Sequence, residues 1–417
     1  MSEKTILLCT IGSAGDVNPF IAIGQRLLKR GFRVVLITSQ YFESQADDAG
    51  LEFIGLGSVD DYRTIIDNPD LWDANKGFRV FAETVVLPIL EPAYEIISGF
   101  DPTKTIIVAQ GQFFAAHIAH EKLGFPFITV HLQPAALRSV HEFPMLPAWM
   151  PSFLKHGMFN LIDALVLDKL FAPKINDFRK RLGLPAVKKI FDRWMHSPQR
   201  NLCLFPDWFA QPQPDWPAQT KLTGFVYYDK RSQHENSPRD LEAFLEAGSA
   251  PIVFTPGTAM KHADQFFLEC IEACRLLGRR GILLTQHPGQ LPRELPADIR
   301  HFDYLAFSEV LPHCAALVHH GGIGTTAQAM AVGIPQVIRP MAHDQPDNAA
   351  RVQKLGIGAT LSPAKFNAVS LAEKLTALMT SQAVLDRCRT CAERIDSEQS
   401  LNETGAVIED FCRDQLK

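Results

Sequence analysis

Several features are missing from this sequence, and each absence excludes a class of protein. No stretch approaches the run of about 18 apolar residues that a membrane-spanning helix requires. The first residues form a short, strand-like apolar segment rather than a secretory signal. No run of basic residues occurs, and the formal net charge of −5 offers no basic face to the phosphates of a nucleic acid. We therefore expect a cytoplasmic protein that does not bind nucleic acid.

Sequence patterns that hold a metal ion are also missing. No two aspartates have the D-x-D spacing of a site that binds a metal and a phosphate together. His117, His120 and Glu121 lack the H-E-x-x-H order of a zinc site. Cys388 and Cys391 form a C-x-x-C pair without a second pair to complete four ligands. The sequence thus predicts no metal and no bound cofactor, and its cysteines are expected to be reduced and structural.

Two series of short apolar strands, each alternating with helical patterns, fill most of the chain. Continuous apolar runs of this length are typical of parallel strands that are buried on both faces. The pattern predicts the α/β class, with two Rossmann-like, doubly wound domains whose strand ends face a cleft. The predicted strands cover residues 6–10, 34–38, 105–109 and 126–131 in the first series and 251–255, 281–285, 315–319 and 335–338 in the second.

The composition between the two series predicts the domain boundaries. Residues 147–184 are helical without a strand signal, which indicates a helical insertion at one end of the first sheet. Residues 205–238 are dense in proline and lack long periodicity. We predict an N-terminal, acceptor-binding domain over 1–215, a linker over 216–238, a C-terminal, donor-binding domain over 239–395, and a final helix over 396–417 that can pack back on the first domain.

A glycine-rich turn follows the predicted strand that ends at His319. Bare glycines let the backbone approach an anion, and the next helix offers unpaired N–H groups at its start. His319 or His320 can add a charge-assisted bond to a diphosphate, although a tight turn with a core histidine would also explain the pattern. The candidate donor-binding residues of this turn are Gly321, Gly322, Gly324 and Thr325, with Thr326 as a further hydroxyl donor.

Two other strand ends carry polar residues that suit a sugar nucleotide. Asp344 and Gln345 lie after a strand and at the start of a helix. A carboxylate and an amide side by side can hold adjacent sugar hydroxyls, and Asp344 can also cap the helix. Gly257 and Thr258 follow the first strand of the second series, where an ordinary strand-to-helix turn is the simpler interpretation.

The first strand of the protein leads into a loop that contains a single carboxylate, Asp16. Gly12 and Gly15 are three residues apart and a third glycine is missing, so the dinucleotide fingerprint G-x-G-x-x-G fails. A carboxylate here would also repel a pyrophosphate. Asp16 is therefore expected either to cap the helix or to act as a general base toward an acceptor hydroxyl.

Together these motifs resemble the UDP-glycosyltransferase superfamily of GT-B enzymes. The resemblance spans both domains through 12–19 (GSAGDVNP), 319–326 (HHGGIGTT), 333–336 (GIPQ) and 343–348 (HDQPDN). It implies an inverting, metal-independent glycosyltransferase whose second domain binds a nucleoside-diphosphate sugar. The loop resembles that of sterol and glycopeptide-antibiotic glycosyltransferases, which implies that Asp16 is the base. The resemblance also aligns Tyr304 with an aromatic residue that stacks on the nucleobase.

Within the superfamily, the sequence is similar to the rhamnosyltransferases of rhamnolipid biosynthesis. The similarity rests on Ala14, on 194–198 (WMHSP) and on 203–209 (CLFPDWF). It implies dTDP-L-rhamnose as donor and a hydroxyalkanoyloxyalkanoate lipid as acceptor. It also allows a peripheral contact with the inner membrane and a partnership with the synthase of the acyl precursor. That family has proline at the position of His320, whereas the H-x-G-x-N-S motif of plant relatives favours His320 as the diphosphate ligand.

The acceptor contacts that we expect are Ser13, Phe113 and His131. The 28 phenylalanines against six tyrosines favour an apolar acceptor, although core packing explains most phenylalanines as well. The main alternative is a UDP-glucose-dependent glucosyltransferase that acts on sterols, macrolides or phenolics. Two further alternatives are a nucleotide-sugar-binding protein without catalysis and an NAD-dependent oxidoreductase, which the broken fingerprint disfavours.

Overall fold

The computed structural model of the protein describes residues 4–147, 149–229 and 239–416. These residues divide into two compact units. The first unit comprises Met1–Leu71, Lys76–Tyr228 and Ser397–Lys417. The second unit comprises Trp72–Asn75 and Asp229–Asp396.

The first unit is built on a seven-stranded sheet in the order β3-β2-β1-β4-β5-β6-β7. All neighbouring strands pair in parallel, and β1 and β4 are buried at every residue because helices cover both faces. The strand order reverses between β1 and β4, and ligands of doubly wound sheets bind at the carboxyl ends of the strands at such a reversal. The strands are β1 Thr5–Cys9, β2 Arg33–Ser39, β3 Glu52–Leu56, β4 Thr105–Gln110, β5 Phe127–His131, β6 Arg200–Cys203 and β7 Thr220–Leu222.

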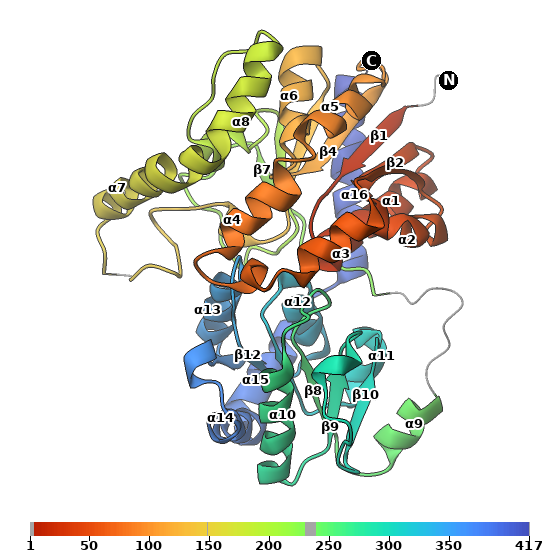
Figure 1. Cartoon of the computed structure of the whole chain (residues 1–417), viewed down its shortest axis with the longest axis vertical. Coiled ribbons are helices and arrows are strands. Elements are labelled where there is room, and N and C mark those ends of the chain that lie inside the picture. Colours follow the sequence, from red (N-terminus) through yellow and green to blue (C-terminus); the bar gives the residue numbers. More distant parts are fainter. Residues whose placement is uncertain (1–3, 148, 230–238, 417) are drawn as a thin grey trace. The chain divides into compact units, whose positions relative to one another are not determined.

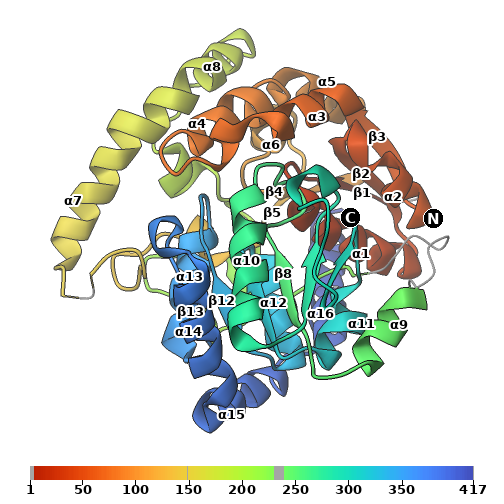
Figure 2. The ribbon, with the colours of Figure 1, turned by 60° about the horizontal axis from the view of Figure 1, so that its bottom comes forward.

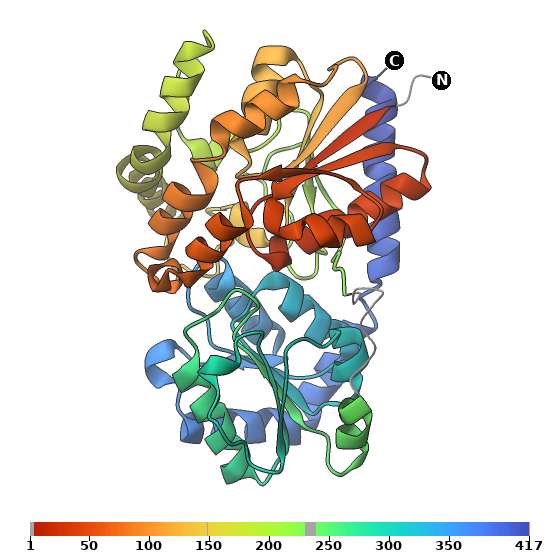
Figure 3. The same cartoon turned by 45° about the vertical axis from the view of Figure 1, so that its right-hand side comes forward.

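The α-helices of the first unit are labelled in Figure 1, and three π-helical segments adjoin them. They are α1 Ala14–Lys29, α2 Glu43–Asp48, α3 Val59–Asp67, α4 Gly77–Phe81, η3 Ala82–Val86, α5 Leu90–Ser98, α6 Phe114–Leu123, α7 Ser152–Ile162, η5 Asp163–Leu167, α8 Asp168–Arg181, η6 Ile190–Trp194 and α16 Ser397–Gln415. The C-terminal helix α16 lies beside α1 (Figure 3), where Arg30 donates to the carbonyl of Asn402 at 3.1 Å. Thr404 of α16 also donates to Thr223 at 2.7 Å, so the end of the chain is tied to the first unit.

The second unit repeats the same architecture with six parallel strands in the order β10-β9-β8-β11-β12-β13. The order reverses between β8 and β11, so its ligand-binding edge is expected after these two strands. Its strands are β8 Ile252–Thr255, β9 Gly281–Leu284, β10 Ile299–Phe302, β11 Ala316–His319, β12 Gln336–Ile338 and β13 Gly358–Thr360. Its helices are α9 Arg239–Glu246, α10 Asp264–Leu277, α11 Phe307–Val310, α12 Ile323–Val332, α13 Gln345–Leu355, α14 Ala368–Thr380 and α15 Gln382–Ala392.

The predicted α/β class with two doubly wound sheets is confirmed. The predicted linker needs correction, because residues 216–228 belong to the first unit and include the edge strand β7, while residues 230–238 lie outside the described residues. A three-residue edge strand with an exposed Lys221 carries too little apolar periodicity to stand out among prolines. The first helix begins at Ala14 and contains Pro19 within its first two turns.

Candidate functional site

In the first unit, Asp16 lies in the first turn of α1, directly after β1. Gly12 has a φ of +121°, and a Cβ added there would lie 2.3 Å from Oδ2 of Asp16. Only glycine therefore fits this position, for its backbone conformation and for the space that the carboxylate needs. The backbone N–H of Ser13 donates to Oδ2 at 2.9 Å, and the Ser13 hydroxyl lies 3.2 Å from the same oxygen. The loop thus orients the carboxylate through one oxygen.

The other carboxylate oxygen of Asp16 is held by Gln110, the last residue of β4. Nε2 of Gln110 donates to Oδ1 of Asp16 at 3.1 Å. Oε1 of Gln110 accepts from the backbone N–H of Ile11 at 3.0 Å, and this bond fixes which end of the amide faces Asp16. Since β1 and β4 are the two strands at the reversal of the sheet, the pair lies at the place where such folds bind ligands.

Burial raises the pKa of Asp16 to about 6, against the opposing hydrogen bonds from Ser13 and Gln110. A carboxyl group with a pKa near 6 is ionised at neutral pH and still basic enough to take a proton from a hydroxyl in a transition state. The electrostatics of the loop therefore suit a general base as well as a helix-capping group.

The three expected acceptor contacts have different environments. Ser13 is half-buried and its hydroxyl bonds to Asp16. Phe113 is 0% exposed and belongs to the apolar core of the first unit, so packing alone accounts for it. His131 ends β5 and is also buried, with its Nε2 lying 3.0 Å from Nδ1 of His196. Burial lowers the pKa of both imidazoles, which makes them a neutral, hydrogen-bonded pair.

In the second unit, the two adjacent histidines after β11 have different roles in the structure. His319 is buried, its Nε2 pairs with Oε1 of Gln336 at 2.9 Å, and its Nδ1 accepts from the N–H of Gly321 at 3.1 Å. Both ring nitrogens of His319 are therefore occupied inside the fold. His320 is half-buried, and its Nδ1 has no hydrogen-bond partner among the described residues.

The imidazole of His320 lies against two glycines. A Cβ added at Gly257 would lie 2.9 Å from the ring, and one added at Gly322 would lie 2.6 Å from its Nε2. Glycine at both positions leaves the space that the ring occupies. Burial lowers the pKa of His320 to about 4, so the ring is neutral at pH 7. In this state the imidazole can donate an N–H without carrying a positive charge.

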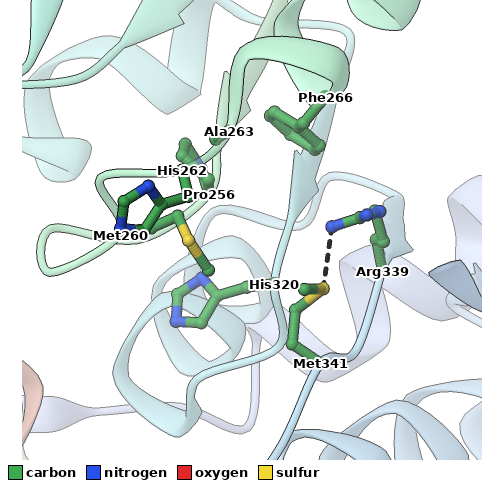
Figure 4. Close-up of a pocket in the computed structure, with 8 residues that line it drawn as sticks. All are labelled: Pro256, Met260, His262, Ala263, Phe266, His320, Arg339 and Met341. Carbon is green, nitrogen blue, oxygen red and sulfur yellow. Dashed lines mark hydrogen bonds between the residues drawn. The ribbon is translucent and has the colours of Figure 1, made fainter. Parts of the chain in front are cut away.

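His320 also lines a small pocket that is partly open to solvent. Figure 4 shows Met260 and Met341 close to the imidazole, with Phe266 farther along the wall. Arg339 contributes a cation, and its Nη1 contacts the sulfur of Met341 at 2.7 Å. The other lining residues are Pro256, His262 and Ala263. An apolar wall with an imidazole and a guanidinium suits a ligand that joins an anionic group to an apolar one.

The start of helix α12 adds backbone donors beside His320. Gly322 is the N-cap residue, and the first turn of an α-helix leaves its N–H groups without partners inside the helix. Such an end attracts anions. Thr325 is half-buried in this turn, whereas the hydroxyl of Thr326 donates to the carbonyl of Gly322 at 3.0 Å. Of the two hydroxyls that the sequence suggested, that of Thr326 is thus used within its own helix.

Asp344 and Gln345 adjoin the same edge of the sheet, and neither side chain caps α13. Oδ2 of Asp344 accepts from Asn348 at 2.7 Å. Gln345 is 3% exposed, and its Oε1 accepts from the backbone N–H groups of Met341 and Ala342. The preceding residue, His343, has a φ of +60°, a conformation that is costly for a residue with a side chain and that occurs often at ligand sites.

The two remaining donor candidates lie at other strand ends of the second unit. Thr258 is exposed after β8. Tyr304 is half-buried after β10, and its hydroxyl lies 3.4 Å from Oδ1 of Asp229. Asp229 also accepts from the N–H of Ser308 at 2.6 Å, which ties the tyrosine to the start of α11.

Sequence reasoning missed Gln110 and Arg339. Gln110 could have been found as the polar residue that ends an otherwise almost wholly apolar strand just before Gly111, at the strand end that the topology places beside β1. Arg339 follows the short strand β12 directly, but nothing in its sequence context distinguishes it from a surface arginine.

No group of three or more His, Cys, Asp or Glu side chains within the described residues is arranged to hold a metal ion. Within the same residues, no helix has both the length and the apolar character to cross a membrane.

Two protein families match parts of the sequence. Residues 6–142 match the "Glycosyltransferase family 28 N-terminal domain". Residues 281–409 match the "Erythromycin biosynthesis protein CIII-like, C-terminal domain". The first range contains Asp16 and Gln110, and the second contains His320 and Arg339.

Relatives along the whole chain are named as sugar transferases. "O-mycaminosyltylonolide 6-deoxyallosyltransferase" of Streptomyces fradiae is 29% identical over 428 residues, which cover 98% of this chain and 97% of the relative. "Sterol 3-beta-glucosyltransferase" of Saccharomyces cerevisiae (strain YJM789) is 26% identical over 437 residues, which cover 96% of this chain and 34% of the relative. The chain thus spans about a third of the yeast enzyme's length.

Solved structures with the same fold include three glycosyltransferases. The glycotransferase of kitacinnamycin superposes with a TM-score of 0.74 at 19% identity, over 99% of this chain and 100% of the other. VinC in complex with dTDP gives 0.66 at 18% identity, over 98% and 99% of the two chains. The spinosyn rhamnosyltransferase SpnG gives 0.65 at 15% identity, again over 98% and 99%. The two units therefore have the GT-B fold.

Proposed function

We propose that the protein is a glycosyltransferase of the GT-B superfamily that inverts the anomeric centre while it transfers a 6-deoxyhexose to a hydroxyl of an apolar acceptor. The observation that carries the mechanism is the position of Asp16 at the reversal of the first sheet, with Oδ2 held by Ser13 and Oδ1 by Gln110. A carboxylate with a raised pKa at a ligand-binding edge is well suited to proton abstraction.

In the proposed reaction, Oδ1 of Asp16 takes the proton of the acceptor hydroxyl. A carboxylate oxygen has two lone pairs, and the bond from Gln110 uses one of those on Oδ1. The acceptor oxygen forms a bond to the anomeric carbon while the bond from that carbon to the diphosphate oxygen breaks. The nucleoside diphosphate leaves with the bonding electrons. A single displacement of this kind inverts the configuration of the sugar.

We assign stabilisation of the leaving diphosphate to the second unit. The N–H groups at the start of α12, the neutral imidazole of His320 and the guanidinium of Arg339 are the donors available after β11 and β12. His319 is assigned a structural role, since both its ring nitrogens are bonded within the fold. With these donors the reaction needs no metal ion.

For the sugar nucleotide we propose a dTDP-6-deoxyhexose, with dTDP-L-rhamnose as the specific donor. Relatives named for 6-deoxyallosyl and rhamnosyl transfer support a deoxysugar, and a fold neighbour in complex with dTDP supports the thymidine nucleotide. The methionines of the pocket supply apolar surface of the kind that a 6-methyl group prefers over a hydroxyl. We assign Asp344 and Gln345 to the ring hydroxyls and Tyr304 to the nucleobase.

As acceptor we propose a hydroxyalkanoyloxyalkanoate lipid, as the similarity to the rhamnolipid family implies. A second candidate is a macrolide or a sterol, which the names of the two relatives favour. Both classes present a hydroxyl on a large apolar body, so the same base serves either. The position of an acceptor beside Ser13 and His131 is part of this proposal.

A product screen tests the proposal. The purified protein is incubated with dTDP-L-rhamnose or UDP-glucose and with a hydroxyalkanoyloxyalkanoate, a macrolide aglycone or a sterol, and products are identified by mass spectrometry. We expect one rhamnose unit added to the lipid, with inverted configuration by NMR. If the sugar is transferred only to the sterol or the macrolide, the second candidate becomes the assigned acceptor in place of the lipid. A retained anomeric configuration would contradict the single displacement.

A further inference from the structure

One helical surface of the first unit exposes large apolar side chains to solvent. Helix α7, the π-helical segment η5 and helix α8 follow one another without a break from Ser152 to Arg181, and Figure 2 shows α7 and α8 in one line at the margin of the first unit. We define the α7 surface by its exposed residues, which are Trp149 (79% exposed), Phe153 (73%), Leu154, Leu161, Leu165 (61%) and Val166.

The α7 surface has the reverse of the usual pattern for a helix on a globular domain. Such a helix normally turns its apolar face to the core and its charged face to water. Here Lys155 and Asp163 are 4% and 2% exposed and face the protein, together with Phe159. Asp163 accepts from Nη2 of Arg138 at 2.7 Å, so its inward position is held by an ion pair. The leucines one turn away are consequently left in water.

The segment around this surface has the opposite charge to the rest of the protein. From Trp149 to Trp194 it contains nine Lys and Arg and four Asp, a net charge of +5 in a protein whose total is −5. Four exposed lysines of this segment form no ion pair with any described residue. They are Lys169, Lys174, Lys180 and Lys188. Lys169 follows Leu165 by about one helical turn, so a cation borders the apolar surface directly.

We propose that the α7 surface docks the protein on an anionic lipid bilayer. Exposed Trp, Phe and Leu side chains beside lysines are the composition of helices that lie in the interface of a membrane, where the apolar face enters the acyl region and the cations meet lipid phosphates. A second copy of this protein is disfavoured as the occupant, since two segments of net charge +5 would repel each other. The inference is independent of the proposed sugar donor.

Flotation with lipid vesicles tests the proposal on the full-length protein. Vesicles of phosphatidylcholine alone are compared with vesicles that contain 30% phosphatidylglycerol, each at low and at high salt. We expect the protein to float with the anionic vesicles at low salt, and high salt to weaken this binding. The variant Leu154→Gln/Leu161→Gln/Leu165→Gln should lose at least about tenfold in partitioning, because each leucine contributes buried apolar area.

A matched control makes the same kind of substitution, from exposed apolar residues to glutamine, on the second unit. Leu268, Leu276 and Val369 are 48%, 46% and 59% exposed there, and their triple change to Gln should leave vesicle binding unaltered. The melting temperature of both variants is measured, so that unfolding is recognised. A second measurement uses the protein with its leucines intact. Brominated lipid should quench the fluorescence of Trp149, and the variant Trp149→Phe serves as the blank.

Several outcomes would overturn the inference. They are an absence of binding to anionic vesicles, equal binding of the two triple variants, or an absence of quenching at Trp149. A stable dimer that dissociates in the leucine variant without any vesicle binding would assign the surface to a second copy instead. If the protein binds phosphatidylcholine vesicles as strongly as anionic vesicles, and salt does not change this binding, the role assigned to the lysines is refuted.

Discussion

Replacing Gln110 by methionine should change the pH dependence of transfer more than its maximum rate. The substitution keeps the length of the side chain and removes both polar atoms. Asp16 then loses the donor on Oδ1 and keeps the two contacts from Ser13 on Oδ2. The hydrogen bond from Gln110 lowers the pKa of Asp16, so its removal raises that pKa above its present value of about 6.

The size of the effect follows from the strength of the lost bond. A hydrogen bond to a charged group contributes on the order of 1.5 kcal/mol, and 1.36 kcal/mol corresponds to one pKa unit, so the pKa should move by about one unit. The ionised fraction of Asp16 then falls about fivefold at pH 6 and about twofold at pH 7, whereas it hardly changes at pH 9. Loss of Oε1 also leaves the buried N–H of Ile11 without its acceptor, at a cost in stability of about 1 to 3 kcal/mol.

The measurement is kcat/KM for a fixed donor and acceptor between pH 5 and pH 9, with the melting temperature recorded at each pH. Gln112→Met is the matched control, since this neighbouring glutamine makes no side-chain hydrogen bond to Asp16 among the described residues. If the acid limb of the profile stays where it is in the unaltered enzyme, or if the rate falls equally at every pH, Gln110 does not set the basicity of Asp16. A shift of the acid limb that occurs only in the control variant Gln112→Met would lead to the same conclusion.

The remaining predictions concern the base, the leaving group and the donor. Asp16→Asn should fold and bind dTDP, as measured by calorimetry, while transfer falls by at least about a hundredfold; near-normal turnover would exclude Asp16 as the base. His320→Ala should weaken dTDP binding and turnover together, whereas unchanged binding would move the diphosphate elsewhere. Activity should survive EDTA, and complete inhibition that magnesium reverses would contradict metal independence. The ratio of kcat/KM should favour dTDP-L-rhamnose over UDP-glucose, with a contribution of about 1 to 3 kcal/mol from the 6-methyl contact.

The central strands could be predicted from sequence because burial on both faces leaves a simple signal. Residues 6–10 and 105–109 are almost wholly apolar, and they overlap β1 and β4. The strands that were missed are short or lie toward the edges of the two sheets. β13 covers three half-buried residues, and β3 begins with an exposed glutamate, so pairing with a neighbour rather than local composition determines them.

The site could be predicted in part for a related reason. Glycine turns and single polar residues after strands are visible in the sequence, and they led to Asp16 and His320. The partners of these residues were not visible, because Gln110 reaches Asp16 only through the pairing of β1 with β4. The two histidines could not be distinguished either, since their difference depends on Gln336, which the pairing of β11 with β12 brings beside His319.

The loop between β1 and α1 shows how one residue can satisfy a structural and a chemical requirement together. Asp16 lies in the first turn of α1, where a negative charge favours the helix, and it accepts the backbone N–H of Ser13. These contacts alone would lower its pKa, yet burial outweighs them and raises it to about 6. A capping residue in water would be a weaker base, so burial at the reversal of the sheet is what gives the same carboxylate the basicity that the proposed mechanism requires. Gly12 permits this position, because any side chain there would displace Oδ2.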